Sequence, residues 1–242
     1  MRLLPTVLAA ASFLQCSALV YASPQVTKVE PPNWWVGHTV NPVRVLIRGS
    51  GFEGASVHAA TGLSVGNVRV NESGTYLFAD ITISPSAKPG DYSLEVRASG
   101  GSVNTPFRLD RPLSPTGRFQ GFSQDDVIYL IMPDRFADGD ESNDDPAISR
   151  GLFDRNKPRS YHGGDLQGII DHLPYLQALG VTALWLTPVY DNLNHLNEKQ
   201  TVEGQPVTDY HGYGAIDYYS VEEHLGNLAL LRELVDRAHA RA

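Results

Sequence analysis

The stretch Val127-Ile-Tyr-Leu-Ile-Met132, with the residues that follow it, decides the fold of the second half of this chain. A nearly unbroken apolar run of this kind is typical of a strand that is buried on both faces. Residues 133–145 then form a polar loop with six acids and a single arginine, Arg135. A helical pattern and a second apolar strand, Thr182-Ala-Leu-Trp-Leu-Thr187, come next. This order predicts a βα unit of a parallel sheet.

Two helices are predicted around these strands. The first covers residues 166–180, where Gly180 is a natural C′ residue and apolar side chains recur at helical spacing at positions 166, 169, 170, 173, 176 and 179. Pro174 must open a new helical segment or kink the existing one, because it lacks an amide and crowds the preceding turn. Residues 190–221 are predicted to be a long polar loop. Asn227 then caps a second helix, whose apolar side carries Leu228, Leu231, Leu234, Val235 and Ala238.

The first half of the chain has a β rhythm. Turn-forming residues separate stretches in which apolar and polar residues alternate, namely Val43–Arg48, Leu63–Val70, Tyr76–Ile83 and Tyr92–Arg97. Short strands at this spacing predict an antiparallel β-sandwich of immunoglobulin type, without the usual disulfide.

Trp34 and Trp35 are adjacent, so on an extended segment they point to opposite faces. They could form a platform on which a sugar stacks, or an apolar patch that docks a neighbouring domain. The simpler interpretation, favoured for at least one of them, is a core tryptophan beside a partly covered neighbour.

The composition and the N-terminal residues indicate the class of the protein and its location. The 242 residues carry a formal charge of −8, which argues against a nucleic-acid partner. Residues 1–22 have the features of a secretory signal, with a buried helix or a membrane anchor as the alternatives. We expect its removal, together with the only cysteine, Cys16, to leave a periplasmic or secreted protein without membrane attachment.

A Pro/Ser/Gly-rich segment after Asp110 predicts a domain boundary. We therefore expect a signal peptide at 1–22, a first domain at 23–110, a linker at 111–120 and a second domain at 121–242.

Four motifs of the second domain resemble the opening of an α-amylase superfamily (glycoside hydrolase family 13) barrel: Ile128–Asp140, His162–Gly168, Gly180–Pro188 and Tyr210–Tyr213. The stretch Val26–Gly37 is similar to the N-terminal domain of bacterial cyclomaltodextrinases and neopullulanases. The resemblance implies a multidomain chain: an immunoglobulin-like β-sandwich followed by the first two βα units of an incomplete (β/α)8 TIM barrel.

The resemblance also implies retaining hydrolysis of α-1,4-glucosidic bonds in cyclodextrins, maltooligosaccharides, pullulan or starch. In the family, the three catalytic carboxylates lie on the fourth, fifth and seventh strands, so no catalytic residue is assigned within these 242 residues. We expect the chain to be the N-terminal part of such an enzyme and inactive alone. The alternative is a non-catalytic maltooligosaccharide-binding or non-functional truncated product. Homodimerisation through the first domain, as in relatives, is left open.

Calcium is the cofactor that the acidic loop suggests. Hard oxygen ligands occur within seven residues, at Asp138, Asp140, Asn143 and Asp144, and Gly163 with Asp165 matches the second half of the family's calcium site. The alternative is a solvated acidic loop. An EF-hand is excluded, because its register would require Gly at position 143 and Glu at position 149.

His211 and Tyr213 match sugar-contact positions of the family, next to the bond that is cleaved. An aromatic face can cover the apolar side of a pyranose while an imidazole bonds a hydroxyl group. Without the motif, a satisfied loop histidine would be the simpler interpretation.

Overall fold

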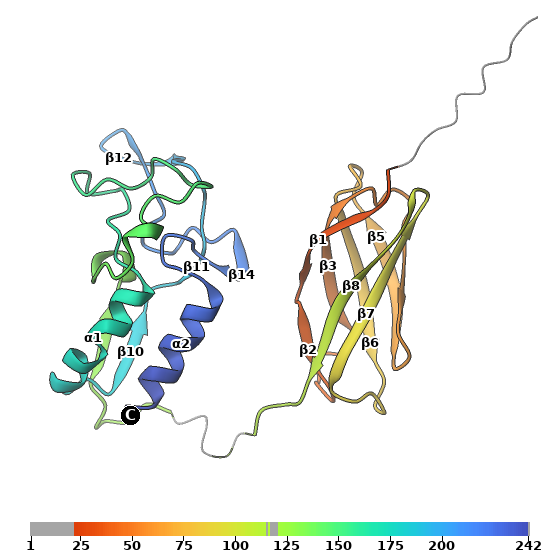
Figure 1. Ribbon diagram of the computed structural model, residues 1–242, viewed down its shortest axis with the longest axis horizontal. Coiled ribbons are helices and arrows are strands. Elements are labelled where there is room, and N and C mark those ends of the chain that lie inside the picture. Colours follow the sequence, from red (N-terminus) through yellow and green to blue (C-terminus); the bar gives the residue numbers. More distant parts are fainter. Residues whose placement is uncertain (1–21, 115, 117–120, 242) are drawn as a thin grey trace, which may run out of the picture. The chain divides into compact units, whose positions relative to one another are not determined.

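A computed structural model describes residues 22–114, 116 and 121–241 of the protein. The chain divides into two compact units, Met1–Ser114 and Pro115–Ala242 (Figure 1). The predicted signal segment with Cys16 lies outside the described residues except for Ala22, as does half of the predicted linker. Over the described residues, no helix is both long and apolar enough to cross a membrane.

The described part of the first unit contains two four-stranded sheets. One has the order β1-β3-β6-β5 and is antiparallel throughout. The other has the order β2-β8-β7-β4, in which only β2 runs parallel to its neighbour. The strands are β1 (Gln25–Glu30), β2 (Asn33–Trp35), β3 (Val43–Ser50), β4 (Ser56–Ala59), β5 (Leu63–Val70), β6 (Tyr76–Ile83), β7 (Gly90–Ala98) and β8 (Gly101–Asp110).

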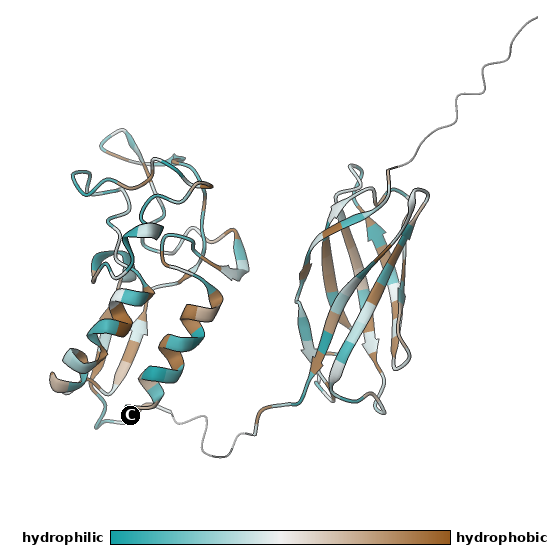
Figure 2. Cartoon of the chain, in the orientation of Figure 1, coloured by the Kyte–Doolittle hydropathy of each residue, from teal (hydrophilic) through white to brown (hydrophobic). Residues whose placement is uncertain are grey.

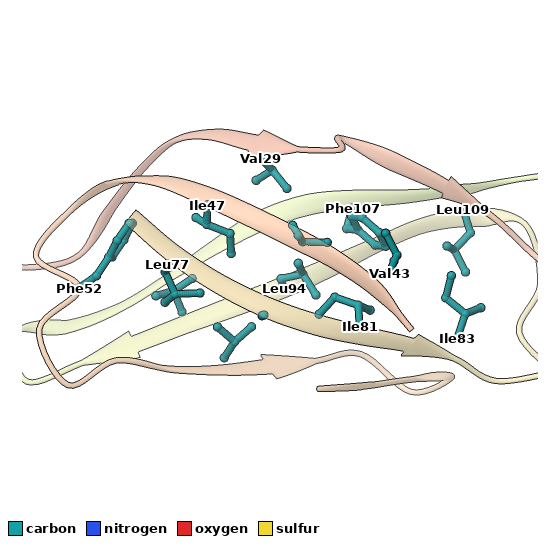
Figure 3. Packing of buried hydrophobic residues seen from close by; sticks show 14 residues of the cluster. Val29, Val43, Ile47, Phe52, Leu77, Ile81, Ile83, Leu94, Phe107 and Leu109 are labelled. Carbon is teal, nitrogen blue, oxygen red and sulfur yellow. The ribbon is translucent and has the colours of Figure 1, made fainter. Parts of the chain in front are cut away.

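Both sheets contribute to one hydrophobic core (Figure 3). Along β3, Val43, Val45 and Ile47 are buried while the residues between them are more exposed, as the period of a strand requires. Phe107 on β8 and Leu94 on β7 are fully buried against them. The first unit is therefore the β-rich domain that the sequence predicts, and the immunoglobulin-type topology stays a prediction.

The adjacent tryptophans lie on β2 and are both partly buried. Trp34 packs against the core, and its Nε1 donates a hydrogen bond to the Val40 carbonyl at 3.1 Å. The two ring centroids are only 5.3 Å apart, so the rings are not separated onto opposite faces as expected. This favours the interpretation of a core tryptophan with a partly covered neighbour.

Asp80 is a charged residue at the edge of this core and is 8% exposed. Arg44 donates to both of its carboxylate oxygens, from Nε at 2.7 Å and from Nη2 at 3.0 Å. Asn67 Nδ2 adds a bond of 2.8 Å. These bonds, with that from Arg44 first, lower the pKa of Asp80 to about 2.

The pKa of Asp80 predicts how acid destabilises the first unit. Because the native pKa lies below the unfolded value of about 3.9, the stabilisation is present above that value. It is lost as the pH falls from there toward 2. We expect Asp80→Asn to lower the melting temperature at pH 7 and to flatten the acid limb of a melting-temperature profile. Asp91→Asn is the control, since the Asp91 side chain is 80% exposed. An unchanged acid limb in Asp80→Asn would contradict this assignment.

The second unit contains the predicted order of strand, helix and parallel strand. β9 (Ile128–Ile131) pairs in parallel with β10 (Ala183–Leu186), and α1 (Leu166–Ala178) lies between them in sequence. α1 and α2 (Leu228–His239) share a core with Ile131 of β9. Two short 3-10 helices, η1 (Pro133–Arg135) and η2 (Glu141–Asn143), lie in the acidic loop.

Both predicted helix ends are confirmed. Asn227 accepts a hydrogen bond from the Leu230 amide at 3.0 Å, and Gly180 follows the C-cap with φ +85°. Of the two alternatives at Pro174, the new helical segment is wrong, because α1 runs through this residue, and a kink stays a prediction. Pro174 itself lies on the exposed side of α1.

Two other expectations about the second unit are corrected. The paired strands are not buried on both faces, since Leu130 is 62% and Trp185 63% exposed. In the described residues their sheet has two strands only, and Leu130 and Trp185 are directly paired in it. The segment 190–221 is not a plain loop, because short strands pair within it: β11 (Tyr190–Asp191) with β14 (Asp217–Val221), and β12 (Asn197–Val202) with β13 (Gln205–Val207).

Candidate functional site

The site residues gather where the parallel strands end. β9 leads into η1 and the acidic loop, and β10 leads into Thr187 and Pro188. The Thr187 amide donates to the Ile131 carbonyl at 2.9 Å, which keeps the two strand ends together. The loops beyond them are largely hydrophilic (Figure 2). In sheets of parallel strands, this carboxyl end is where active sites are built.

Asp165 fastens the acidic loop to α1. It is fully buried at the N-cap of α1, where its Oδ1 accepts from the Gly168 amide at 2.6 Å. Across the loop, the amides of Gly139 and Asp140 donate to its two oxygens at 3.1 and 2.9 Å. Asn143 Nδ2 donates to Oδ2 at 3.1 Å. Each oxygen of Asp165 thus accepts two hydrogen bonds, a structural role that the sequence did not predict.

Three other predicted ligands have buried oxygens that accept no hydrogen bond. They are Oδ1 of Asp138, Oδ1 of Asn143 and Oδ1 of Asp144. Gly163 lies against the last of these, since a Cβ added to Gly163 would come within 2.1 Å of Asp144 Oδ1. A buried polar atom without a partner is costly, so a cluster of such oxygens needs a donor or a cation.

The charges of the acidic loop also favour a bound cation. Burial, followed by the charge of Asp138, raises the pKa of Asp144, and Arg155 opposes this rise. Arg155 pairs with Asp138 through Nη2 and donates from Nε to the His162 carbonyl at 2.9 Å. The loop therefore holds carboxylates whose charge one arginine only partly balances.

These residues fit calcium, which prefers carboxylate and carbonyl oxygens and tolerates irregular geometry. Asp140 differs from the others in the predicted set, because it is exposed and its Oδ1 accepts from the Ser142 amide and hydroxyl at 3.0 and 2.6 Å. The structure brings Asp138, Asn143, Asp144 and Gly163 together and leaves the Asp140 carboxylate at the rim.

The predicted sugar-contact residues lie together on the loop that packs against the end of β10. The Tyr213 amide donates to His211 Nδ1 at 3.0 Å, and the two ring centroids are 5.8 Å apart. Between them Gly212 has φ +86°, and a Cβ there would come within 1.9 Å of the Pro188 carbonyl oxygen. Tyr213 is 70% exposed, so its ring face is open to a ligand.

The second unit also contains a buried polar group that the sequence did not predict. The rings of Tyr161 and His224 are stacked with centroids 3.8 Å apart, and His224 Nδ1 lies 2.7 Å from Glu222 Oε1. Burial raises the pKa of the Tyr161 hydroxyl, and the charges of Glu222 and Asp209 add to the rise. Ligand atoms of Glu222, Glu223 and His224 lie within 4.8 Å of one another, which a metal ion could use. The Glu-Glu-His run is the only signal of this group in the sequence.

Comparison with known families agrees with the motifs. Residues 130–242 match the family model of the α-amylase catalytic domain, and residues 28–111 match that of the cyclomaltodextrinase N-terminal domain. Most of the second unit is therefore similar to the first part of an α-amylase catalytic domain, and most of the first unit to an N-terminal domain of cyclomaltodextrinase type.

Several relatives match about half of the chain. It is 42% identical over 115 residues to a cyclomaltodextrin glucanotransferase of Klebsiella oxytoca, covering 48% of this chain and 16% of that protein. It is 41% identical over 121 residues to neopullulanase 2 of Thermoactinomyces vulgaris, covering 50% of this chain and 18% of that protein. It is 37% identical over 118 residues to a cyclomaltodextrinase of Thermoanaerobacter pseudethanolicus, covering 49% of this chain and 18% of that protein. The chain thus spans less than a fifth of the length of these relatives.

Proposed function

We propose that this chain is the N-terminal portion of an exported hydrolase that cleaves α-1,4-glucosidic bonds with retention, in cyclodextrins, maltooligosaccharides, pullulan or starch. The observation that carries the proposal is the pair of His211 and Tyr213, held side by side at the carboxyl end of β10 with the tyrosine ring exposed. Such a pair offers a pyranose both an apolar face and a hydrogen-bonding nitrogen.

The proposal assigns binding, not bond cleavage, to residues 1–242. Retaining hydrolysis needs two carboxyl groups about 5–5.5 Å apart, one as nucleophile and one as acid and base. Three of the described acids are engaged in structural contacts: Asp165 caps α1, Asp138 pairs with Arg155, and Glu222 accepts from the Asn192 amide. We therefore expect residues 23–242 alone to bind α-glucans without cleaving them.

Calcium is the cofactor of this proposal. Asp138, Asn143 and Asp144 would hold it with the carbonyl oxygen of Gly163, and Asp140 and Asp165 complete the predicted set. When bound, the ion would balance the loop's negative charge and join the acidic loop to the segment before α1. Homodimerisation through the first domain stays a prediction.

Substitution of Tyr213 tests the sugar-contact proposal. We expect Tyr213→Ala to weaken maltoheptaose binding roughly tenfold, because an aromatic contact worth about 1.4 kcal/mol is lost. Isothermal calorimetry measures this effect. Tyr175→Ala is the matched control, since Tyr175 is also exposed, at 56%, but lies near the far end of α1. Failure of the unsubstituted protein to bind maltoheptaose would contradict the proposal.

A further inference from the structure

Tyr210, which precedes the sugar-contact histidine, is held by two arginines from other parts of the second unit. The guanidinium carbon of Arg135 lies 3.9 Å from the centroid of the Tyr210 ring. Arg159 Nη1 donates to the Tyr210 hydroxyl at 3.3 Å. A cation at this distance from an aromatic centroid is strongly attracted to the ring face.

Three other groups of the second unit hold the Arg135 side chain in place. Its Nη2 donates to the carbonyl oxygens of Pro158 and Ser160, both at 2.9 Å, and its Nη1 forms an ion pair with Asp134. The Arg135 side chain is 24% exposed, and burial lowers the pKa of its guanidinium group. A cation that has lost much of its water interacts more strongly with an aromatic face than an exposed one. The arginine therefore presents a rigid plane to the ring of Tyr210.

The backbone before Tyr210 is bound to the same segment. The amide and the hydroxyl of Thr208 donate to the Arg159 carbonyl at 3.1 and 2.9 Å, and Thr208 is fully buried. Residues 158–160 thus hold the sugar-contact loop by its backbone while they also hold Arg135 against the ring of Tyr210.

From Tyr210 the constraint reaches the predicted sugar contacts. The rings of Tyr210 and His211 meet edge to face with centroids 5.4 Å apart. On its other side, His211 accepts the Tyr213 amide at Nδ1. The Tyr210 ring and the Tyr213 amide therefore fix the orientation of the His211 imidazole.

We propose that Arg135 is a positioning residue for glucan binding, which acts through Tyr210 and does not touch the sugar. It holds the loop of His211 and Tyr213 in the conformation that receives a pyranose, so the loop need not be ordered when the ligand arrives. This inference rests on the proposed function of His211 and Tyr213.

The test compares glucan affinity with thermal stability. We expect Arg135→Gln to raise the Kd for maltoheptaose at least fivefold, and Arg135→Lys, which keeps the charge over the ring, to restore part of that loss. Tyr210→Leu should raise the Kd at least as much as Arg135→Gln, because it also removes the bond from Arg159 and the ring contact with His211. Adding Arg135→Gln to Tyr210→Leu should raise the Kd no further, because Arg135 acts through this ring. Arg150→Gln, at an exposed arginine, is the matched control and should leave the Kd unchanged.

The outcomes separate this inference from the proposed function. Normal maltoheptaose binding with an unchanged Kd in both Arg135→Gln and Tyr210→Leu would overturn the positioning role alone. A lower melting temperature of Arg135→Gln with an unchanged Kd would overturn it as well, since a purely structural arginine behaves that way. Absence of binding by the unsubstituted protein would overturn both. If Arg135→Gln does not fold, Arg135→Lys and Tyr210→Leu decide the question by the same measurement.

Discussion

Asp144→Ala is expected to remove most of the rise in melting temperature that calcium gives the protein. At a calcium concentration one hundred times the Kd, a ligand that binds only the folded state stabilises it by about 2.7 kcal/mol. Asp144 offers a buried oxygen without a hydrogen-bond donor, and its loss leaves the ion one anionic ligand short. Without calcium, the variant should melt no lower than the unsubstituted protein, because the substitution removes a carboxylate whose pKa is raised by burial and by Asp138.

Scanning calorimetry with calcium and with EDTA measures both effects. Glu141→Ala is the matched control, since it removes one negative charge from the same loop at an exposed position and should keep the calcium effect. Asp165→Ala should instead melt lower under both conditions, because four hydrogen bonds at the N-cap and across the loop are lost. If EDTA does not change the melting temperature of the unsubstituted protein, the loop is merely acidic.

Phe107→Ala is expected to destabilise the first unit by about 3–5 kcal/mol, the usual cost of removing a fully buried aromatic ring. A typical domain is stable by only about 5–15 kcal/mol, so the effect is a large share of the total. Urea unfolding of residues 22–114, followed by tryptophan fluorescence, measures it, because this unit has a core of its own. Phe78→Ala is the control: Phe78 lies in the same unit but is 39% exposed and should cost far less. Equal losses in the two variants would place Phe107 outside the core.

Local patterns predicted the elements whose side chains follow a strict period. β3 and β6 alternate between buried and exposed residues over most of their length, and Asn227 and Gly180 mark helix ends by chemistry that needs no tertiary partner. β8 was missed, since its inward positions include a polar residue, Thr105, and its run contains Pro106.

The hairpin of β12 and β13 was missed for a different reason. Its strands are mostly exposed, so no apolar alternation marks them, and its turn is formed by Glu203 and Gly204, both with positive φ.

In the candidate site, too, features that follow from local sequence were predicted and long-range contacts were not. Motif positions placed His211 beside Tyr213 and the acids of the loop near Gly163, because these residues are close in sequence or match a family pattern. The contact of Arg135 with Tyr210 and the stack of Tyr161 on His224 join residues more than sixty positions apart. Local periodicity does not predict such contacts, because they depend on how α1 and the loop after β10 fold in three dimensions.

Hydrolysis of maltoheptaose, followed by the NMR signals of its anomeric protons, tests the proposed function most directly. We expect the complete gene product to release sugars that first appear as the α-anomer, because a retaining reaction preserves the configuration of the bond it cleaves. Residues 23–242 alone should bind maltoheptaose and release nothing. Absence of α-glucan turnover by the complete gene product would contradict the proposed function, as would turnover by residues 23–242 that is lost when one of their carboxylates is replaced.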